Sequence, residues 1–230
     1  MSSHLEKQHV PHHRIAAVDG KYLSDSEFTQ FYSADHPNAY YKTLSRAEVA
    51  CYLSHRRAWQ AIIDNNLDFA IILEDDVELL DNFTSSVRAI ADMPADWDYI
   101  KLAEYPLKRR PLYSINTGGF SRVIYNKVPA RTCAQAVSRA GAMKLLRHSD
   151  RLFRPIDIDL QYWWEKDINV FGLLPYPVQP LIEIQSDIDQ TEKREKAQRD
   201  QWKKLTNMWH FYWQNRQHTR LKIAQRKQHQ

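Results

Sequence analysis

Three consecutive carboxylates, Glu74-Asp75-Asp76, directly follow a short apolar run, Phe69-Ala70-Ile71-Ile72-Leu73. A continuous apolar run of this length is typical of a strand that is covered on both faces, as in a parallel sheet. Because ligands of open α/β sheets bind beyond the carboxyl ends of the strands, the triplet stands where such a fold makes its site. Carboxylate oxygens suit Mn²⁺ or Mg²⁺, and such an ion neutralises a departing diphosphate. The alternative is that Asp75 and Asp76 only cap the next helix.

Two further carboxylates, Asp157 and Asp159, follow Pro155 and are candidates for taking a proton from a substrate hydroxyl. Carboxylates that face the dipole of a helix N-terminus explain this position equally well. Asp187 could approach a metal or a ligand from the C-terminal side, or it could only form a turn. His55 lies on an apolar-adjacent face of a predicted helix, where a lone histidine is more often a packing residue than a catalytic one.

The elements that must position these groups alternate between strand and helix. Ser45-Arg46-Ala47-Glu48 has the form of a capping box, and the apolar spacing after it predicts a helix over 46–64. We expect strands at 11–19, 69–73, 98–102 and 133–137, and helices at 81–91, 140–148 and 155–164. Residues 104–131 show no period and are interpreted as a long loop that closes over a ligand, while 171–184 is punctuated by proline and suits short strands. The fold class is therefore α/β.

Composition excludes several classes of protein. The chain has 230 residues, of which 43% are hydrophobic and 26% charged, so it is a folded chain rather than a disordered one. Cys51 and Cys133 form no C-x-x-C pair, and the ten histidines show no zinc-binding spacing. No apolar run reaches the length of a signal peptide core or of a membrane span, and we expect a cytoplasmic protein.

Charge divides the chain into two parts. Residues 191–230 contain 11 basic and 3 acidic residues, whereas residues 1–190 contain 21 basic and 25 acidic ones. Within the basic part, six apolar residues recur on one helical face: Trp202, Leu205, Met208, Trp209, Tyr212 and Trp213. Lys203, Lys204, Arg216 and Arg220 surround them. A basic amphipathic helix over 200–222 could associate with the inner face of a membrane, or it could pack its aromatic face on the domain.

Several ordered motifs resemble glycosyltransferase family 25, which includes the lipopolysaccharide and lipooligosaccharide glycosyltransferases and the collagen galactosyltransferases. The central match combines Glu48, Ala50, Cys51, Ser54, His55 and Trp59 with the run Leu73-Glu74-Asp75-Asp76-Val77. Ala17-Val18-Asp19-Gly20 is similar to an early family segment, and 136–142 is similar to a later one. Pro155-Ile156-Asp157 and Ser186-Asp187-Ile188 resemble the last two. The resemblance spans about residues 5–190 and is far more specific than the acidic triplet alone.

The resemblance implies a nucleotide-sugar-binding fold of the GT-A type with a mostly parallel central sheet, in a domain over 1–190 that is followed by a helical tail over 191–230. It implies an inverting, metal-dependent transfer of a hexose, galactose from UDP-galactose, to a lipooligosaccharide or lipopolysaccharide core. Asp76 is then the chief ligand of Mn²⁺ or Mg²⁺, with Glu74 and Asp187 beside it, and Asp157 or Asp159 acts on the acceptor. The remaining matched residues are expected to bind the donor: Val18, Asp19, Gly20, Ser54, His55, Glu74 and Asp75.

One departure from the family pattern bears on this expectation. Family members usually begin with a strand that lies under the nucleotide, and this sequence starts after the corresponding point. Two other functions therefore stay open. One is a metal-dependent phosphohydrolase that uses the same triplet, and the other is a catalytically silent module whose tail binds membrane or RNA. Nucleic acid is not an expected partner of the glycosyltransferase itself.

Overall fold

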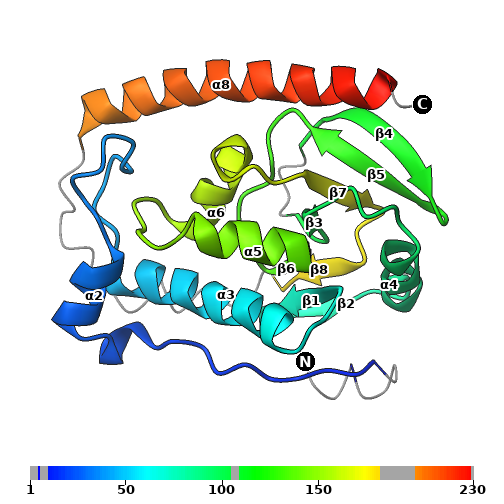
Figure 1. Cartoon of the computed structure of the whole chain (residues 1–230), viewed down its shortest axis with the longest axis horizontal. Helices are drawn as coiled ribbons and strands as arrows, with labels where there is room; N and C mark the ends of the chain where they lie inside the picture. The colour runs from blue at the N-terminus through cyan, green and yellow to red at the C-terminus, as the bar shows by residue number, and fades with distance from the viewer. Residues whose placement is uncertain (1–4, 6–9, 105–108, 182–199, 229–230) are drawn as a thin grey trace.

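The computed structural model describes residues 5, 10–104, 109–181 and 200–228. A six-stranded sheet lies between helices, and one long C-terminal helix runs along the side of the molecule opposite α3 (Figure 1). The helices, with two 3₁₀ segments, are η1 (Gly20–Tyr22), α2 (Asp25–Phe31), α3 (Arg46–Asp64), α4 (Phe83–Ala91), α5 (Arg139–Arg147), α6 (Ile156–Asp159), η2 (Leu160–Lys166) and α8 (Gln201–Gln228). No helix in the described ranges is both long and apolar enough to cross a bilayer.

The large sheet has the strand order β1-β6-β3-β7-β5-β4, and a separate pair joins β2 to β8. Its strands are β1 (Phe69–Leu73), β3 (Tyr99–Lys101), β4 (Pro111–Thr117), β5 (Phe120–Tyr125), β6 (Ala134–Ser138) and β7 (Val170–Leu174), while β2 is Val77–Leu79 and β8 is Val178–Pro180. Among the strands that the structure describes, only β3 and β7 pair in parallel. The fold is mixed α/β, and the expectation of a mostly parallel sheet is wrong.

Strand β1 explains that error. Its five residues are all partly exposed, because β1 lies at an edge of the sheet and pairs only with β6, in the antiparallel direction. An apolar run can be partly covered by helices and loops on an edge strand, so its composition does not reveal how many strands flank it. The predicted position of the strand is nevertheless confirmed.

The other predicted elements fall into three groups. The helix over 46–64 is confirmed together with its capping box, and α5 begins as expected at Ser138, whose side chain accepts a hydrogen bond from the backbone of Gly141. Residues 11–19 form no strand. The predicted loop over 104–131 contains a β-hairpin instead, in which Gly118 and Gly119, both with positive φ, connect β4 to β5.

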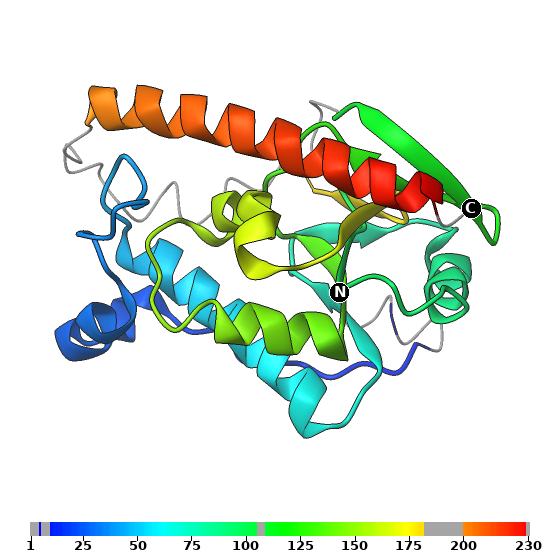
Figure 2. The same ribbon diagram turned by 45° about the horizontal axis from the view of Figure 1, so that its top comes forward.

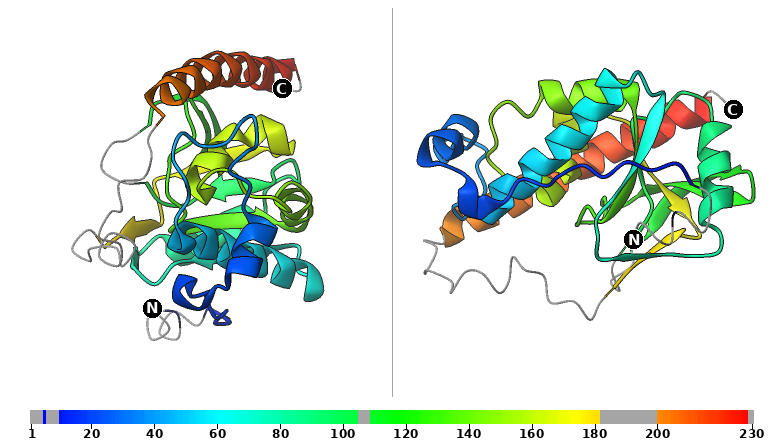
Figure 3. Two further views of the ribbon diagram at one scale, coloured as in Figure 1. Left: turned by 90° about the vertical axis from the view of Figure 1, so that its left-hand side faces the viewer. Right: turned by 90° about the horizontal axis from the view of Figure 1, so that it is seen from below.

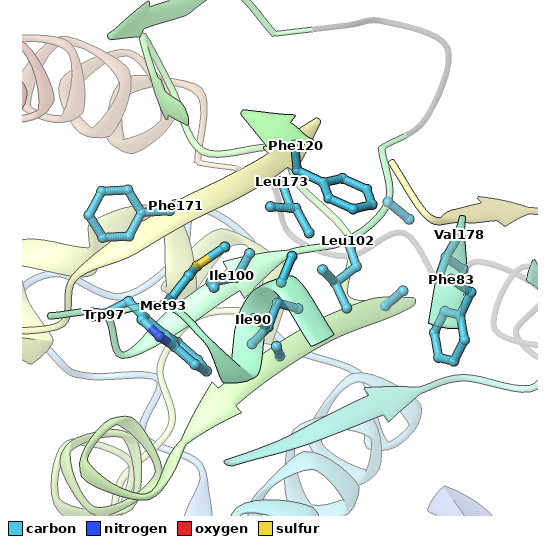
Figure 4. Close-up of a cluster of buried hydrophobic side chains, with 14 of the residues drawn as sticks. Phe83, Ile90, Met93, Trp97, Ile100, Leu102, Phe120, Phe171, Leu173 and Val178 are labelled. Carbon is cyan, nitrogen blue, oxygen red and sulfur yellow. The ribbon is translucent and has the colours of Figure 1, made fainter. Parts of the chain in front are cut away.

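Two hydrophobic clusters hold the layers together. The first joins α4 to one face of the sheet and includes Phe83, Ile90, Trp97, Ile100 and Phe171, which are labelled in Figure 4. The second lies under α3 and α5 and includes Tyr52, Trp59, Tyr99 and Leu145. Helices therefore cover both faces of the sheet, as Figure 2 and the views from the side in Figure 3 show. This packing fixes the end of β1, where the acidic triplet begins.

Candidate active site

Glu74 occupies the first position after β1 and is held from two sides. Its Oε1 accepts a hydrogen bond of 2.7 Å from Thr132 Oγ1 and lies 3.1 Å from Nε2 of His55. The Glu74 amide donates to the Cys133 carbonyl, which continues the pairing of β1 with β6. About a third of the Glu74 side chain is exposed, whereas His55 is buried. The carboxylate is thus fixed in orientation while one side of it still reaches solvent.

Burial by itself would raise the pKa of Glu74, but the hydrogen bonds from His55 and Thr132 and the positive charge of Lys101 hold that pKa below its ordinary value. His55 is oriented in turn by Gln135, whose Nε2 lies 2.9 Å from His55 Nδ1. Tyr99 then donates a hydrogen bond to Gln135 Oε1. A buried relay from β3 through β6 and α3 therefore orients Glu74, and His55 is a positioning residue in this arrangement.

Asp75 and Asp76 differ from Glu74 in their surroundings. Asp75 is exposed, while Asp76 is half-buried, and its Oδ1 is a buried oxygen with no hydrogen-bond partner among the described residues. Burial raises the pKa of Asp76, and the negative charges of Glu74 and Asp75 add to that effect. Neither aspartate caps α4, because the N-cap of that helix is Asn82. An orphaned carboxylate oxygen beside two other carboxylates is a suitable ligand for a divalent cation.

The metal ligands predicted from sequence are only partly brought together. Within the described ranges, no three His, Cys, Asp or Glu side chains converge as a ready metal site. Asp187, the third predicted ligand, lies outside the described residues. The donor set that the described residues offer is therefore Asp76 with Glu74 or Asp75, made of oxygen atoms only. Such a set fits a hard cation that takes its other ligands from water and phosphate, as Mg²⁺ and Mn²⁺ commonly do.

Lys101, at the end of β3, is a site residue that sequence reasoning missed. It is fully buried, and its Nζ donates a hydrogen bond to the Arg131 carbonyl. Burial lowers the pKa of the Lys101 ammonium, although Cys133, Glu74 and Asp157 act in the opposite direction. The sequence signal that could have identified Lys101 is a lysine at the end of an otherwise apolar strand, because lysine is almost never buried without a partner.

Asp157 approaches the same site from α6. Its Oδ2 accepts a hydrogen bond of 3.2 Å from the backbone of Arg131, and its Oδ1 accepts one of 2.8 Å from the Ile158 amide. The side chain is half-buried. Lys101 and Asp157 bind the backbone of Arg131, and Glu74 binds the side chain of the next residue, Thr132. The structure therefore gathers Glu74, Lys101 and Asp157 around Arg131 and Thr132.

Asp159 has a different environment, although it lies only two residues further on. It is buried, and Tyr52 donates a hydrogen bond of 2.6 Å to its Oδ2. Lys166 Nζ lies 2.7 Å from the same oxygen, and Arg154 lies 3.4 Å from Oδ1. Asp159 therefore ties α3 to α6 and η2, and its burial among these partners, unlike the half-buried position of Asp157, keeps it away from a substrate.

The predicted nucleoside segment packs against α3. The Val18 amide donates a hydrogen bond of 2.8 Å to Ser54 Oγ, so these two predicted binding residues meet. Asp19 caps η1 by accepting from the Lys21 amide. A Cβ on Gly20 would lie 2.9 Å from the Ala47 backbone nitrogen, and this close approach requires glycine. Residues 11–19 therefore run along a helix, where side chains of α3 satisfy part of their backbone in place of a strand partner.

A cavity of about 790 Å³ is lined by Ile158, the residue that follows Asp157 in α6, whereas Asp157 is not among the lining residues. The cavity lies between α8 and the rest of the molecule. Six of its lining residues are basic and none is acidic. The basic ones are Arg109, Lys127, Arg154, Lys204, Arg216 and Arg220, and the aromatic ones are Tyr40, Tyr41, Tyr162, Phe211 and Tyr212. Aromatic and cationic side chains together suit a sugar that carries phosphate or carboxylate groups.

The described part of the chain therefore offers the carboxylates of residues 74–76, Asp157 on α6, and a basic cavity that is lined by Ile158 of the same short helix. Comparison with known families gives the class. A model described as glycosyltransferase family 25 (LPS biosynthesis protein) matches residues 1–160, and the chain belongs to this family. The matched range contains Val18 to Gly20, Ser54, His55, the acidic triplet, Lys101 and Asp157.

The relatives include proteins named as galactosyltransferases and proteins named as inactive. The chain is 30% identical over 203 residues to procollagen galactosyltransferase 2 of Homo sapiens, which covers 76% of the chain and 32% of the relative. It is 25% identical to procollagen galactosyltransferase 1 of Danio rerio, over 76% of the chain and 33% of the relative. It is also 26% identical to inactive glycosyltransferase 25 family member 3 of Mus musculus, over 78% and 34%. The chain spans about a third of the length of these relatives.

Proposed function

We propose that the protein is a metal-dependent, inverting glycosyltransferase that moves a hexose, galactose from UDP-galactose, to a lipooligosaccharide or lipopolysaccharide core. Family membership supports sugar transfer, and relatives named as galactosyltransferases support galactose. Because other relatives are named as inactive, membership alone does not decide whether this chain is active. The observation that carries the proposal is the buried, unpartnered Oδ1 of Asp76, placed beside Glu74 and Asp75.

In this proposal Asp76, with Glu74 or Asp75, holds Mn²⁺ or Mg²⁺, and the nucleotide lies in a GT-A type site along Val18–Gly20 and Ser54. If bound there, such an ion would supply positive charge for the diphosphate leaving group. Glu74 is kept ionised and correctly oriented by His55 and Thr132. Lys101 places a buried positive charge beside the carboxylates and limits their mutual repulsion.

The acceptor binds in the basic cavity, and Asp157 is the proposed base. Its carboxylate takes the proton of the acceptor hydroxyl as that oxygen bonds to the anomeric carbon and the bond to the diphosphate breaks. Attack from the side opposite the leaving group inverts the configuration at that carbon. The family description as an LPS biosynthesis protein supports a bacterial core acceptor, and the six cationic side chains of the cavity suit the negative charges of such a glycan.

The test is transfer from a panel of UDP-sugars to a lipooligosaccharide core with Mn²⁺, read as UDP release and as product mass. Asp76→Asn should reduce turnover by about 100-fold or more, because it removes a negative oxygen from the metal site. Glu78→Gln is the matched control: it removes one carboxylate that is exposed on β2, and it should keep full activity. Circular dichroism should show that both variants are folded.

Other outcomes of this experiment would contradict the proposal. Equal activity of wild type and Asp76→Asn would remove the metal site from the mechanism. Phosphate release without any sugar acceptor would identify a phosphohydrolase that uses the same carboxylates. Failure to bind UDP in the presence of Mn²⁺, measured by calorimetry, would indicate a catalytically silent module.

A further inference from the structure

Helix α8 buries polar side chains and exposes tryptophans, which is the reverse of the usual distribution. Its buried residues are Asn215, Thr219 and Lys222, all of them polar. Its tryptophans are exposed, from 80% for Trp202 and 70% for Trp209 to 52% for Trp213, whereas Phe211 and Ile223 are half-buried against the domain. Leu205, Met208, Tyr212 and Leu221 are also more than half exposed. The alternative that the aromatic face packs on the domain is therefore wrong.

Polar contacts to the domain hold α8 in this orientation. Asn215 Nδ2 donates a hydrogen bond of 2.6 Å to the Asn126 carbonyl, and Lys222 Nζ donates one of 2.8 Å to the Val170 carbonyl. Arg226 pairs with Asp96 near the end of the helix, and Asn207 donates to the Ala39 carbonyl near its start, at 3.1 Å. Turning the helix to bury its tryptophans would break all four contacts, so the apolar side chains stay exposed.

The exposed face carries positive charge and no negative charge. Residues 201–228 contain seven Lys and Arg and no Asp or Glu. Arg216 and Arg220 are exposed and lie among the apolar residues, and Arg216 donates a hydrogen bond of 3.0 Å to Tyr212. We call the set Trp202, Leu205, Trp209, Trp213, Arg216 and Arg220 the outer face of α8. At a rise of 1.5 Å per residue it extends over about 30 Å along one straight helix.

We infer that the outer face of α8 docks on the surface of an anionic lipid bilayer. Tryptophan is favoured at the level of lipid headgroups, where its ring is apolar and its N–H is hydrated, and arginine is attracted to acidic lipids. Leucine and methionine gain by entering the acyl boundary, a gain that nucleic acid does not offer them. A second copy of the chain would bring like charges together. A straight, basic and aromatic helix face therefore fits a planar, negatively charged, apolar partner best.

Docking would also place the basic cavity near the lipid. Two residues of the outer face, Arg216 and Arg220, also line that cavity. Two further lining residues, Met208 and Tyr212, flank the outer face. With the proposed function, a lipid-linked acceptor could then reach the cavity from the membrane surface. The docking inference itself does not rest on catalysis, since none of its observations involves the carboxylate site.

The experiment is co-sedimentation of the full chain with vesicles of phosphatidylcholine and phosphatidylglycerol (3:1) or of phosphatidylcholine alone, without nucleotide sugar. We expect at least about tenfold tighter binding to the anionic vesicles at low salt, a blue shift of tryptophan fluorescence on binding, and weakening as salt increases. Trp209→Ser with Trp213→Ser should weaken binding by more than tenfold, because each ring would lose its apolar contact with lipid. Neither tryptophan lines the cavity, so turnover with a soluble acceptor should not change.

The matched control is Tyr22→Ser with Met143→Ser, which removes two exposed apolar side chains far from α8. It should bind vesicles like the wild type. The inference is overturned if wild type does not bind anionic vesicles, or if the tryptophan variant binds as well as the control. It is also overturned if ultracentrifugation shows that the tryptophans join two copies of the chain and thereby block vesicle binding. Tighter binding to a single-stranded oligonucleotide than to vesicles would assign the face to nucleic acid.

Discussion

Helices α3 and α8 run along different sides of the molecule (Figure 1) and treat their aromatic residues in opposite ways. Helix α3 buries Tyr52 and Trp59 in the core and turns His55 toward Glu74. Helix α8 buries amide, hydroxyl and ammonium groups and leaves three tryptophans in solvent. Apolar residues recur at helical spacing in both sequences, so this spacing alone does not say which face meets the protein. The contacts of the polar residues decide this, and those contacts depend on the tertiary structure.

The largest expected effect is a loss of unfolding free energy, and it should separate a buried tryptophan from an exposed one. Trp59→Ala should lower the free energy of unfolding by about 3–5 kcal/mol, because Trp59 is fully buried and packs edge-on against Tyr52. Trp209→Ala should change it by less than about 0.5 kcal/mol, because that ring is 70% exposed. Urea denaturation measures both. Similar losses in the two variants would mean that α8 is packed through its aromatic face after all.

The second prediction concerns the attachment of α8. Asp96 receives hydrogen bonds from Arg122 and Arg226 and so joins α8 to β5. Asp96→Asn should cost about 2–3 kcal/mol, because it weakens two charge-assisted bonds and leaves the buried Arg122 without its anion. Asp92→Asn, at an exposed carboxylate just after α4, is the control and should have little effect.

The stabilisation that Asp96 provides through Arg122 and Arg226 should decrease as the pH falls. Burial alone would raise the pKa of Asp96, but Arg122 and Arg226 hold it below the ordinary value of 3.8. The stabilisation by Asp96 is therefore fully present above about pH 4 to 5 and is lost as pH falls through its folded pKa. The difference in unfolding free energy between wild type and Asp96→Asn should shrink on acidification. A difference that grows below pH 4 would contradict the ion pairs.

The smallest expected loss of unfolding free energy is at the carboxylate site. Glu74→Gln should cost about 1 kcal/mol, since it weakens the bonds from His55 and Thr132 while a third of the side chain remains in solvent. Because the folded pKa of Glu74 is lowered, this contribution also holds above its ordinary pKa of 4.5 and disappears at lower pH. Unfolding curves at pH 7 and pH 3 test it. A variant that is more stable than wild type at pH 7 would show that burial of the charge outweighs its hydrogen bonds.

Local signals predicted much of the fold. The capping box at Ser45 fixed the start of α3, and short apolar runs located β1, β3 and β6 within about one residue. The direction of strand pairing was not predictable, because an apolar run is compatible with an edge or a central strand. The hairpin in 111–125 was missed although Gly118-Gly119 is a hairpin signal, since the flanking residues alternate poorly between polar and apolar.

The candidate site was predicted only in part, because some of its residues belong to sequence motifs and others do not. The triplet, His55 and Asp157 carry recognisable motifs, and the structure brings Glu74, His55 and Asp157 into one region. Lys101 and Gln135 carry no motif, and they join the site only because β3 and β6 pair beside β1. Asp159 shares its short helix with Asp157, yet a helical turn directs it into the core, where it meets Tyr52 and Lys166.

Helix α8 forms one wall of the basic cavity but lies outside the range that matches the family, and this affects how the protein can diverge. Every carboxylate from Glu74 to Asp157 lies within residues 1–160, the range that matches the family, whereas α8 begins at Gln201. The carboxylates and the α8 wall of the basic cavity are therefore encoded far apart, although residues such as Tyr40, Arg109 and Ile158 of the matched range line the cavity too. Exchange of the C-terminal segment alone would change that wall and the exposed face of α8, while the carboxylate site stayed the same. Under the proposed function and the proposed docking, acceptor choice and membrane association would then diverge together without a change in the donor chemistry.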